Sequence, residues 1–191
     1  MNKFDKIRIL KDMNLNTEDS VLINTYSKNP FDSDISIRTQ YKNSYDTYHK
    51  KTLHFPIVKR EDFNKVMNTC FDNNLEMIVA RPIDPKDCLF AGCIMLYNGE
   101  YIIEIANGPG TVRRVTHQGI INEHYTANMF LPRTSNLKIN QALVEIYKLN
   151  KRMTLSDYHI FEFSYYNKPV GWKKENIIFW EFNDLSKRLK K

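Results

Sequence analysis

The chain has 191 residues, of which 42% are hydrophobic and 26% are charged, and this composition is typical of a folded globular protein. No apolar run approaches the roughly 18 residues of a membrane-spanning helix, and the N-terminal sequence lacks the apolar core of a signal peptide, so we expect a cytoplasmic protein with no membrane partner. The net charge is +6, but four basic residues lie in the C-terminal sequence KRLKK, which makes a nucleic-acid partner unlikely on charge alone.

Three segments have apolar residues at helical spacing, namely residues 3–13, 61–73 and 135–150. The apolar face of the second helix is predicted to consist of Phe63, Val66, Met67, Cys70 and Phe71. The apolar face of the third is predicted to consist of Ile139, Ala142, Leu143, Ile146 and Tyr147. Ser135 is the expected N-cap of the third helix, because its hydroxyl can accept a hydrogen bond from the first turn.

Strand patterns lie between these helices. They cover residues 35–40, 76–82, 89–97, 100–106, 111–116, 158–165 and 176–183. Asn98 and Gly99 separate two of these runs, and Asn-Gly is a strong hairpin signal because both residues accept a positive φ. Helices interspersed among antiparallel strand pairs predict an α+β fold rather than a doubly wound parallel sheet. The three cysteines form no CxxC pair, which argues against a disulfide framework or a zinc site.

Two late strands carry acidic residues in apolar surroundings. Glu162 lies in the sequence IFEFS, and Glu181 lies in FWEFN, two residues before Asn183. Residues i and i+2 of a strand point to one face, so Glu181 and Asn183 share a face. If the two strands pair, Glu162 and Glu181 come side by side, and two carboxylates with an amide oxygen are ligands that suit Mg²⁺. The alternative interpretation is that both glutamates simply face solvent on a half-buried sheet.

These sequences resemble the metal-binding end of the ATP-grasp fold, in which an acidic residue on one strand and an E-x-N motif on the next hold Mg²⁺ against ATP. The resemblance implies that Glu162, Glu181 and Asn183 are the metal ligands. The sequence KIRILKDMNLNTEDSVLI resembles the early helix and strand of such proteins, and DSDISIRT resembles the strand whose basic residue, here Arg38, meets the phosphates. The pattern is closest to the nucleotide-binding domains of phosphoenolpyruvate synthase and pyruvate phosphate dikinase.

Further segments follow the order of that fold. The sequence LEMIVARPI resembles the strand and hinge that clamp adenine, which implies cofactor-binding roles for Ala80, Arg81 and Ile83. Glu104, in IEIANGPG, resembles the acidic residue of a later strand in the same enzymes and is also a candidate cofactor-binding residue. Arg113 and Arg114 point to opposite faces if they lie on a strand, so one of them is positioned to neutralise a phosphate or an acidic substrate.

The chain departs from the usual ATP-grasp pattern in three ways. Arginine stands where a first-lobe lysine is more usual. The segment 41–51, where a phosphate-covering loop is expected, contains no glycine. Much of the usual N-terminal substrate domain has no counterpart. These departures weaken the expectation of catalysis more than that of the fold.

The sequence therefore predicts a compact ATP-grasp-like protein with an N-terminal lobe at 1–75 and a C-terminal lobe at 76–191 that carries the metal site. The expected ligands are ATP and Mg²⁺, bound in a cleft between the lobes. The expected activity is that of an ATP-dependent ligase or phosphotransferase on an unknown small-molecule or peptide acceptor. One alternative is a non-catalytic protein that binds a nucleotide or a partner protein. A second is a nucleic-acid-binding module that uses the basic tail and the aromatic residues.

Overall fold

The computed structural model describes residues 2–41, 52–108, 115, 118–153, 155 and 157–185. These residues form an α+β protein with two antiparallel sheets and a few helices, which confirms the predicted fold class. The chain divides into two compact units, Met1–Arg8 with Glu18–Ile83 and Ile9–Thr17 with Asp84–Lys191. No helix in the described ranges is long and apolar enough to span a bilayer.

The first unit is built on a four-stranded antiparallel sheet with the strand order β1-β4-β2-β3. Its strands are β1 (Ser20–Ile23), β2 (Ile35–Tyr41), β3 (His54–Val58) and β4 (Leu75–Ala80). The two central strands, β2 and β4, are the ones that the apolar pattern predicts. Edge strand β3 is mostly exposed and contains Pro56, which an edge strand tolerates because one side of it needs no hydrogen-bond donors.

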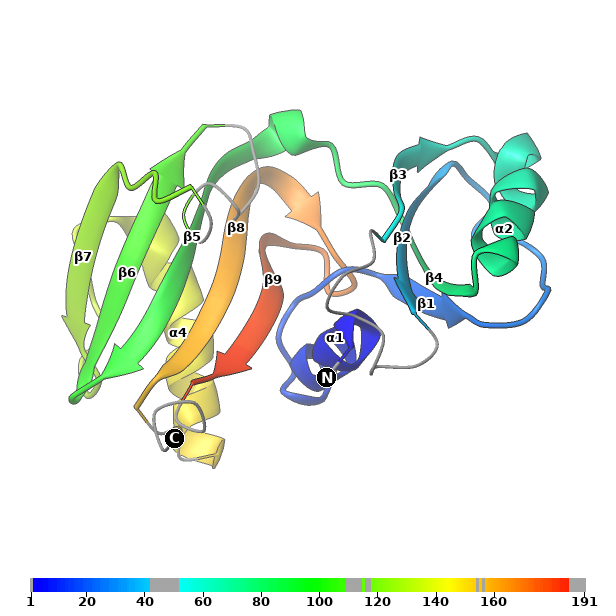
Figure 1. Cartoon of the computed structure of the whole chain (residues 1–191). Helices are drawn as coiled ribbons and strands as arrows, with labels where there is room; N and C mark the ends of the chain where they lie inside the picture. The colour runs from blue at the N-terminus through cyan, green and yellow to red at the C-terminus, as the bar shows by residue number, and fades with distance from the viewer. Residues whose placement is uncertain are drawn as a thin grey trace. The chain divides into compact units, whose positions relative to one another are not determined.

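Helix α2 (Phe63–Asp72) contributes to the core of the first unit, and Figure 1 shows it along one side of the sheet. It follows a short 3₁₀ turn, η2 (Arg60–Asp62). The predicted apolar face is confirmed, since Phe63, Met67 and Cys70 are buried and the other two members are half-buried. This face packs against the apolar residues of β2 and β4.

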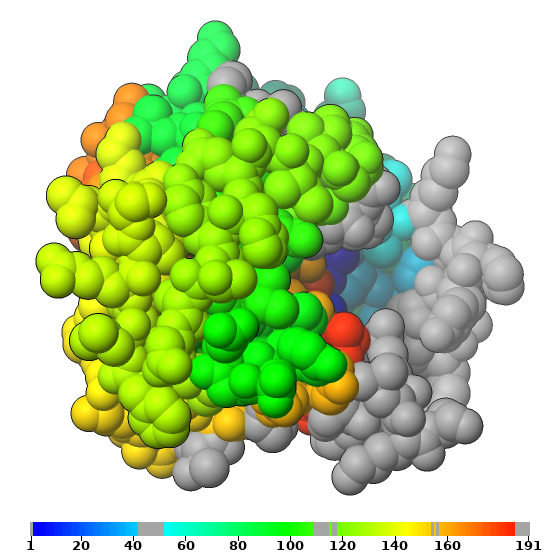
Figure 2. All heavy atoms as spheres, turned by 90° about the vertical axis from the view of Figure 1, so that its left-hand side faces the viewer, coloured from blue at the N-terminus to red at the C-terminus, as the bar shows by residue number. Residues whose placement is uncertain are grey.

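The second unit is built on a five-stranded antiparallel sheet with the strand order β7-β6-β5-β8-β9 (Figure 1). Its strands are β5 (Cys88–Tyr97), β6 (Glu100–Asn107), β7 (Glu123–Asn128), β8 (His159–Val170) and β9 (Glu175–Asp184). A 3₁₀ turn, η3 (Pro85–Asp87), precedes β5. Figure 2 shows the surface to which β6, β7 and α4 contribute (green to yellow).

Helix α4 (Leu137–Met153) buries its apolar stripe in a core shared with one face of this sheet. Four of the five predicted core residues of this helix are fully buried, and Tyr147 is half-buried. The predicted N-cap is wrong by one residue. Asn136, not Ser135, accepts hydrogen bonds through Oδ1, from the backbone N–H groups of Lys138 (3.0 Å) and Ile139 (3.4 Å).

The turn between β5 and β6 fixes the register of the sheet. Asn98 and Gly99 have φ values of 48° and 78°, as the Asn-Gly signal predicts for a two-residue hairpin. Tyr97 therefore pairs with Glu100, and every later pair of this hairpin follows from that one. The predicted hairpin is confirmed.

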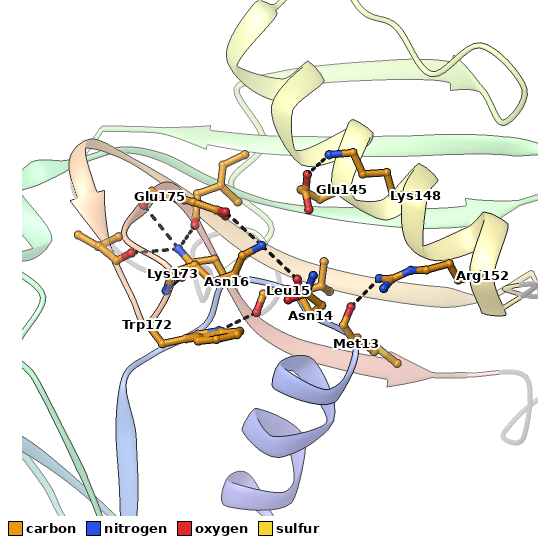
Figure 3. A network of polar contacts seen from close by, with 12 residues as sticks. Met13, Asn14, Leu15, Asn16, Glu145, Lys148, Arg152, Trp172, Lys173 and Glu175 are labelled. Carbon is orange, nitrogen blue, oxygen red and sulfur yellow. Dashed lines mark hydrogen bonds and ion pairs between the residues drawn. The ribbon is translucent and has the colours of Figure 1, made fainter.

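Residues 13–17, which follow helix α1 (Lys3–Asp12), are bound to the connection between β8 and β9 by the polar network in Figure 3. The buried Asn16 side chain donates to the carbonyl oxygens of Val170 (3.0 Å) and Ile177 and accepts from the backbone N–H of Lys173 (2.9 Å). Its own carbonyl accepts from Phe179 N–H at 2.7 Å. Asn16 thus forms hydrogen bonds with the backbone of β9, as a residue of a neighbouring strand would.

Two further bonds fasten the same segment. The Trp172 indole Nε1 donates to the carbonyl of Leu15 at 2.9 Å, and Arg152 on α4 donates to the carbonyl of Met13, also at 2.9 Å (Figure 3). Buried backbone carbonyls require such partners, since leaving one unpaired costs free energy comparable to a lost hydrogen bond. The segment 13–17 is therefore an integral part of the second unit.

Some predicted features lie outside the described residues. Of the strand expected at 111–116 only Val115 is described, and of the loop expected at 41–51 only Tyr41, which ends β2. Arg113, Arg114 and the basic sequence at 187–191 are also outside the described ranges.

Candidate functional site

Five polar side chains form a row across the five-stranded sheet, one from each strand. The register pairs His124 with Glu104, Glu104 with Cys93, Cys93 with Glu162, and Glu162 with Glu181. Directly paired residues point to the same face and have Cβ atoms about 4.5–5.5 Å apart. We call this set the carboxylate row. It lies on the face opposite α4, because the residues that alternate with it, such as Phe161 and Ile103, belong to the core that α4 covers.

The predicted pairing of Glu162 with Glu181 is confirmed by this register. Asn183 pairs with Ile160 and so lies on the same face as Glu181, as strand periodicity predicts. Its Nδ2 donates to Glu181 Oε2 at 3.1 Å. The structure thus brings the three predicted metal ligands together on adjacent strands.

Strand β9 contains one extra residue beside the carboxylate row. Glu181 pairs with Glu162, but Phe179 pairs with the next residue of β8, Phe163, so Trp180 has no directly opposite partner. This is a β-bulge, which re-aims the side chains on one side of it. The Trp180 indole Nε1 donates to the buried hydroxyl of Ser164 at 2.9 Å, on the face of the carboxylate row.

The donor set suits a hard divalent cation. Like charges directly opposite each other on adjacent strands destabilise a sheet, so Glu162 and Glu181 favour a bound cation. Carboxylate and amide oxygens are the ligands that Mg²⁺ takes, and it usually keeps water or substrate phosphates in its other positions. Among the described residues, no three His, Cys, Asp or Glu side chains converge as a metal centre of their own. The two carboxylates and Asn183 would therefore need a further ligand from water or a phosphate.

Cys93 lies between Glu104 and Glu162 in the carboxylate row. Its Sγ donates to Glu104 Oε2 at 3.7 Å. Burial, followed by the negative charges of Glu104 and Glu162, raises the pKa of Cys93 from 9.0 to about 12. The thiol is therefore protonated at neutral pH and is unsuited to act as a nucleophile.

We expect Cys93 to alkylate far more slowly in the folded protein than in urea at pH 8, because only the thiolate reacts. The stability that the protonated thiol contributes is present below pH 9 and is lost as pH rises towards 12. Glu162→Gln removes one of the charges, so it should lower the pKa of Cys93 and speed alkylation. The rate is measured by mass spectrometry of the Cys93 peptide after iodoacetamide treatment at several pH values. Equal rates in the folded and the urea-unfolded protein would contradict this picture.

Arg38, the predicted phosphate-binding residue of the first unit, forms an ion pair with a buried glutamate. Its Nη2 pairs with Glu18 Oε1, and the side chain of Glu18 is only 6% exposed, compared with 29% for Arg38. A buried carboxylate requires such a partner. The ion pair therefore fixes the guanidinium of Arg38, whose side chain is partly exposed.

The residues expected near adenine lie at and after the end of β4. Ala80 pairs with Ser20 on one side and with Ser36 on the other. The backbone N–H of Arg81 donates to Asp19 O at 3.3 Å, and its side-chain Nε donates to Asp19 Oδ2 at 3.2 Å. Arg81 is thus bound to the residue that precedes β1, whereas the half-buried Ile83 follows in the irregular connection.

A groove in the second unit does not coincide with these residues. It runs between α4 and the start of β9 and has a volume of about 520 Å³. Its lining includes Leu137, Val144, Lys174 and Ile177, and none of the residues predicted for nucleotide or metal binding. We place the site on the carboxylate row because the chemistry of the donors outweighs the depth of a groove.

Sequence reasoning missed four residues that share the face of the predicted ligands, namely Cys93, His124, Ser164 and Trp180. The Asn-Gly turn could have revealed Cys93, because a two-residue hairpin that pairs Tyr97 with Glu100 also pairs Cys93 with Glu104. No local signal identifies Ser164 or Trp180, because their meeting depends on a bulge in the partner strand.

Comparison with known proteins finds solved structures of similar fold at low sequence identity. No protein-family model and no curated protein sequence matches the chain. The macrocyclase MdnC from Microcystis aeruginosa MRC, solved with its precursor peptide MdnA, aligns over 97% of this chain at 12% identity and a TM-score of 0.50. D-alanyl-alanine synthetase A from Vibrio cholerae O1 aligns over 96% at 11% identity and a TM-score of 0.51.

Both of these structures are ATP-grasp enzymes. The chain spans about half of their length, 53% of the first and 55% of the second. At this level of identity the similarity concerns the fold alone. The order of helices and strands predicted from the sequence, the two antiparallel sheets and these structural matches agree, and the chain has an ATP-grasp-like fold.

Proposed function

We propose that the protein binds ATP together with Mg²⁺ and acts as an ATP-dependent ligase or phosphotransferase. One observation carries this proposal: Glu162 and Glu181 are direct cross-strand partners, with Asn183 on the same face of β9. The ATP-grasp-like fold supports the choice of nucleotide, and the two structural neighbours described above are ATP-grasp enzymes.

The proposed roles of the individual residues come from the resemblance to ATP-grasp proteins. Glu162, Glu181 and Asn183 would hold Mg²⁺, which would supply positive charge to the phosphates of ATP. Glu104, in the same row, binds the cofactor. Arg38 and one of Arg113 and Arg114 neutralise phosphates, and the backbone between Ala80 and Ile83 binds adenine.

The ATP-grasp-like fold supports the proposed reaction class but indicates no acceptor. ATP-grasp enzymes generally activate a carboxylate as an acyl phosphate for attack by an amine or thiol, or transfer a phosphoryl group. One neighbour is bound to a precursor peptide, and the name of the other is that of a synthetase of alanyl-alanine, so a peptide or a small amino compound is a reasonable class of acceptor to screen. A closer kinship with phosphoenolpyruvate synthase stays a prediction.

A second candidate function is nucleotide binding without turnover. Its support is that the segment 41–51, where a phosphate-covering loop is expected, contains no glycine, and that arginine stands where a lysine is more usual. Release of ADP or AMP from ATP, measured with the purified protein across a panel of amino acids and peptides, distinguishes the two functions. Turnover with any acceptor would exclude the non-catalytic alternative.

The test of ATP binding is calorimetric titration of ATP into the wild-type protein, with Mg²⁺ and with EDTA. We expect saturable binding with Mg²⁺ that weakens at least about tenfold in EDTA, since the cation links phosphates to carboxylates. An absence of binding in both buffers would overturn the proposal, and equal binding in both would overturn the metal's role.

A further inference from the structure

The bulge in β9 determines which side chains of this strand lie on the same face of the sheet as the carboxylate row. Before the bulge, Phe179 pairs with Phe163 on the core face. After the bulge, Phe182 pairs with Phe161 on that same face. Two residues, Trp180 and Glu181, lie between Phe179 and Phe182, whereas only Glu162 lies between their partners on β8. β9 therefore has one residue more than a regular strand would have here.

Without the bulge, β9 would place Glu181 on the core face of the sheet. If β9 continued from Phe179 without a bulge, Trp180 would pair with Glu162 and Glu181 would pair with Phe161, on the core face. A slip of one residue moves every side chain to the other face. The bulge must therefore form at Trp180 for Glu181 and Asn183 to join the face of Glu162.

A single side-chain bond is in a position to hold the bulge there. The Trp180 indole Nε1 donates to Ser164 Oγ at 2.9 Å, and Ser164 is only 1% exposed. Ser164 lies two residues beyond Glu162 on β8 and pairs with Ile178, so the indole is directed back along β9. The bond therefore connects the extra residue to the strand that carries the opposing carboxylate.

We propose that Trp180 and Ser164 are positioning residues of the cation site, because their bond fixes the bulge that sets Glu181 opposite Glu162. The inference rests on the proposed cation site. A buried serine whose partner is removed loses its hydrogen bond without gaining water, so the bulged register becomes less favourable. Neither residue needs to touch the cation.

The second tryptophan of the chain provides a matched control. Trp172 also belongs to the second unit, and its indole Nε1 also donates a 2.9 Å bond, in this case to the Leu15 carbonyl. Trp172→Phe therefore removes the same kind of bond from the connection between β8 and β9 without changing a residue of the bulge. A general loss of packing would affect both variants, whereas a positioning role affects only one.

The experiment measures Mn²⁺ affinity by the loss of the free-ion signal in electron paramagnetic resonance, with thermal unfolding of each variant as the fold control. We expect Trp180→Phe and Ser164→Ala each to weaken Mn²⁺ binding about threefold to tenfold. The double variant should be no weaker than the weaker single variant, since both remove one bond. Trp172→Phe should bind Mn²⁺ like the wild type.

The possible failures are distinguishable. If Glu181→Gln abolishes Mn²⁺ binding while Trp180→Phe and Ser164→Ala bind like the wild type, the positioning role is wrong and the cation site stands. If Trp172→Phe weakens binding as much as Trp180→Phe, the effect is general and the positioning role is again wrong. If the wild type binds no Mn²⁺, or if Glu181→Gln binds Mn²⁺ as tightly as the wild type, the proposed cation site is wrong. The positioning role of Trp180 and Ser164 is then wrong as well.

Discussion

Replacing Glu181 with glutamine should strongly weaken magnesium-dependent ATP binding. The substitution keeps the size of the side chain and removes one of the two facing carboxylates. Mg²⁺ favours charged oxygen ligands, and a site with one carboxylate loses much of its attraction for the ion. We expect the apparent Kd for ATP in Mg²⁺ to rise about 30-fold or more, roughly 2 kcal/mol. Calorimetric titration of ATP with Mg²⁺ and with EDTA measures this change.

The control for Glu181 is a glutamate outside the carboxylate row. Glu145 on α4 pairs with Lys148 at 2.7 Å, and Glu145→Gln changes the net charge by the same amount. It should leave ATP affinity unchanged. If both variants bind ATP and Mg²⁺ like the wild type, the carboxylate pair is only the solvent-facing side of a half-buried sheet, which is the alternative that the sequence leaves open.

Replacing Asn16 with alanine should destabilise the protein by about 3–5 kcal/mol. The change leaves the carbonyl groups of Val170 and Ile177 and the N–H of Lys173 without their partner. Each buried polar group left unpaired costs about 1–3 kcal/mol. Urea denaturation, followed by circular dichroism, measures the free energy of unfolding.

An exposed asparagine serves as the control for Asn16. Asn24→Ala removes the same side chain at an exposed position and should change stability by less than about 0.5 kcal/mol. Gly171→Ala tests the network from the other side, because Gly171 has φ +74° and a Cβ there would lie 2.5 Å from Asn16 Oδ1. If Asn16→Ala and Gly171→Ala both have the free energy of unfolding of the wild type, the network contributes little to stability.

The two predictions concern different properties of one hairpin. Asn16 and its partners hold the connection between β8 and β9, whereas Glu162 and Glu181 lie farther along the same two strands. Loss of Asn16 should therefore reduce stability first, and ATP affinity only as far as β9 unfolds. Loss of Glu181 should reduce ATP affinity in a protein that remains folded.

Several parts of the fold were predictable because their signals are local. The amphipathic helix at 61–73 follows from a period of 3.6 residues, and the β5–β6 hairpin follows from the conformational freedom of Asn98 and Gly99. The shared face of Glu181 and Asn183 follows from the two-residue period of a strand. Strand β3 escaped prediction because an exposed edge strand has no apolar alternation to reveal it.

By itself, the sequence determined the α+β class, most helices and strands, and the ATP-grasp-like order of its elements, since each depends on residues close together in the chain. Only the tertiary structure decided that Glu162 stands opposite Glu181, that Cys93 lies between two carboxylates, and that Asn16 binds carbonyl groups more than 150 residues away. The physical reason is register. Periodicity tells which residues share a face of one strand, but a bulge and long-range hydrogen bonds determine which residues of two strands meet.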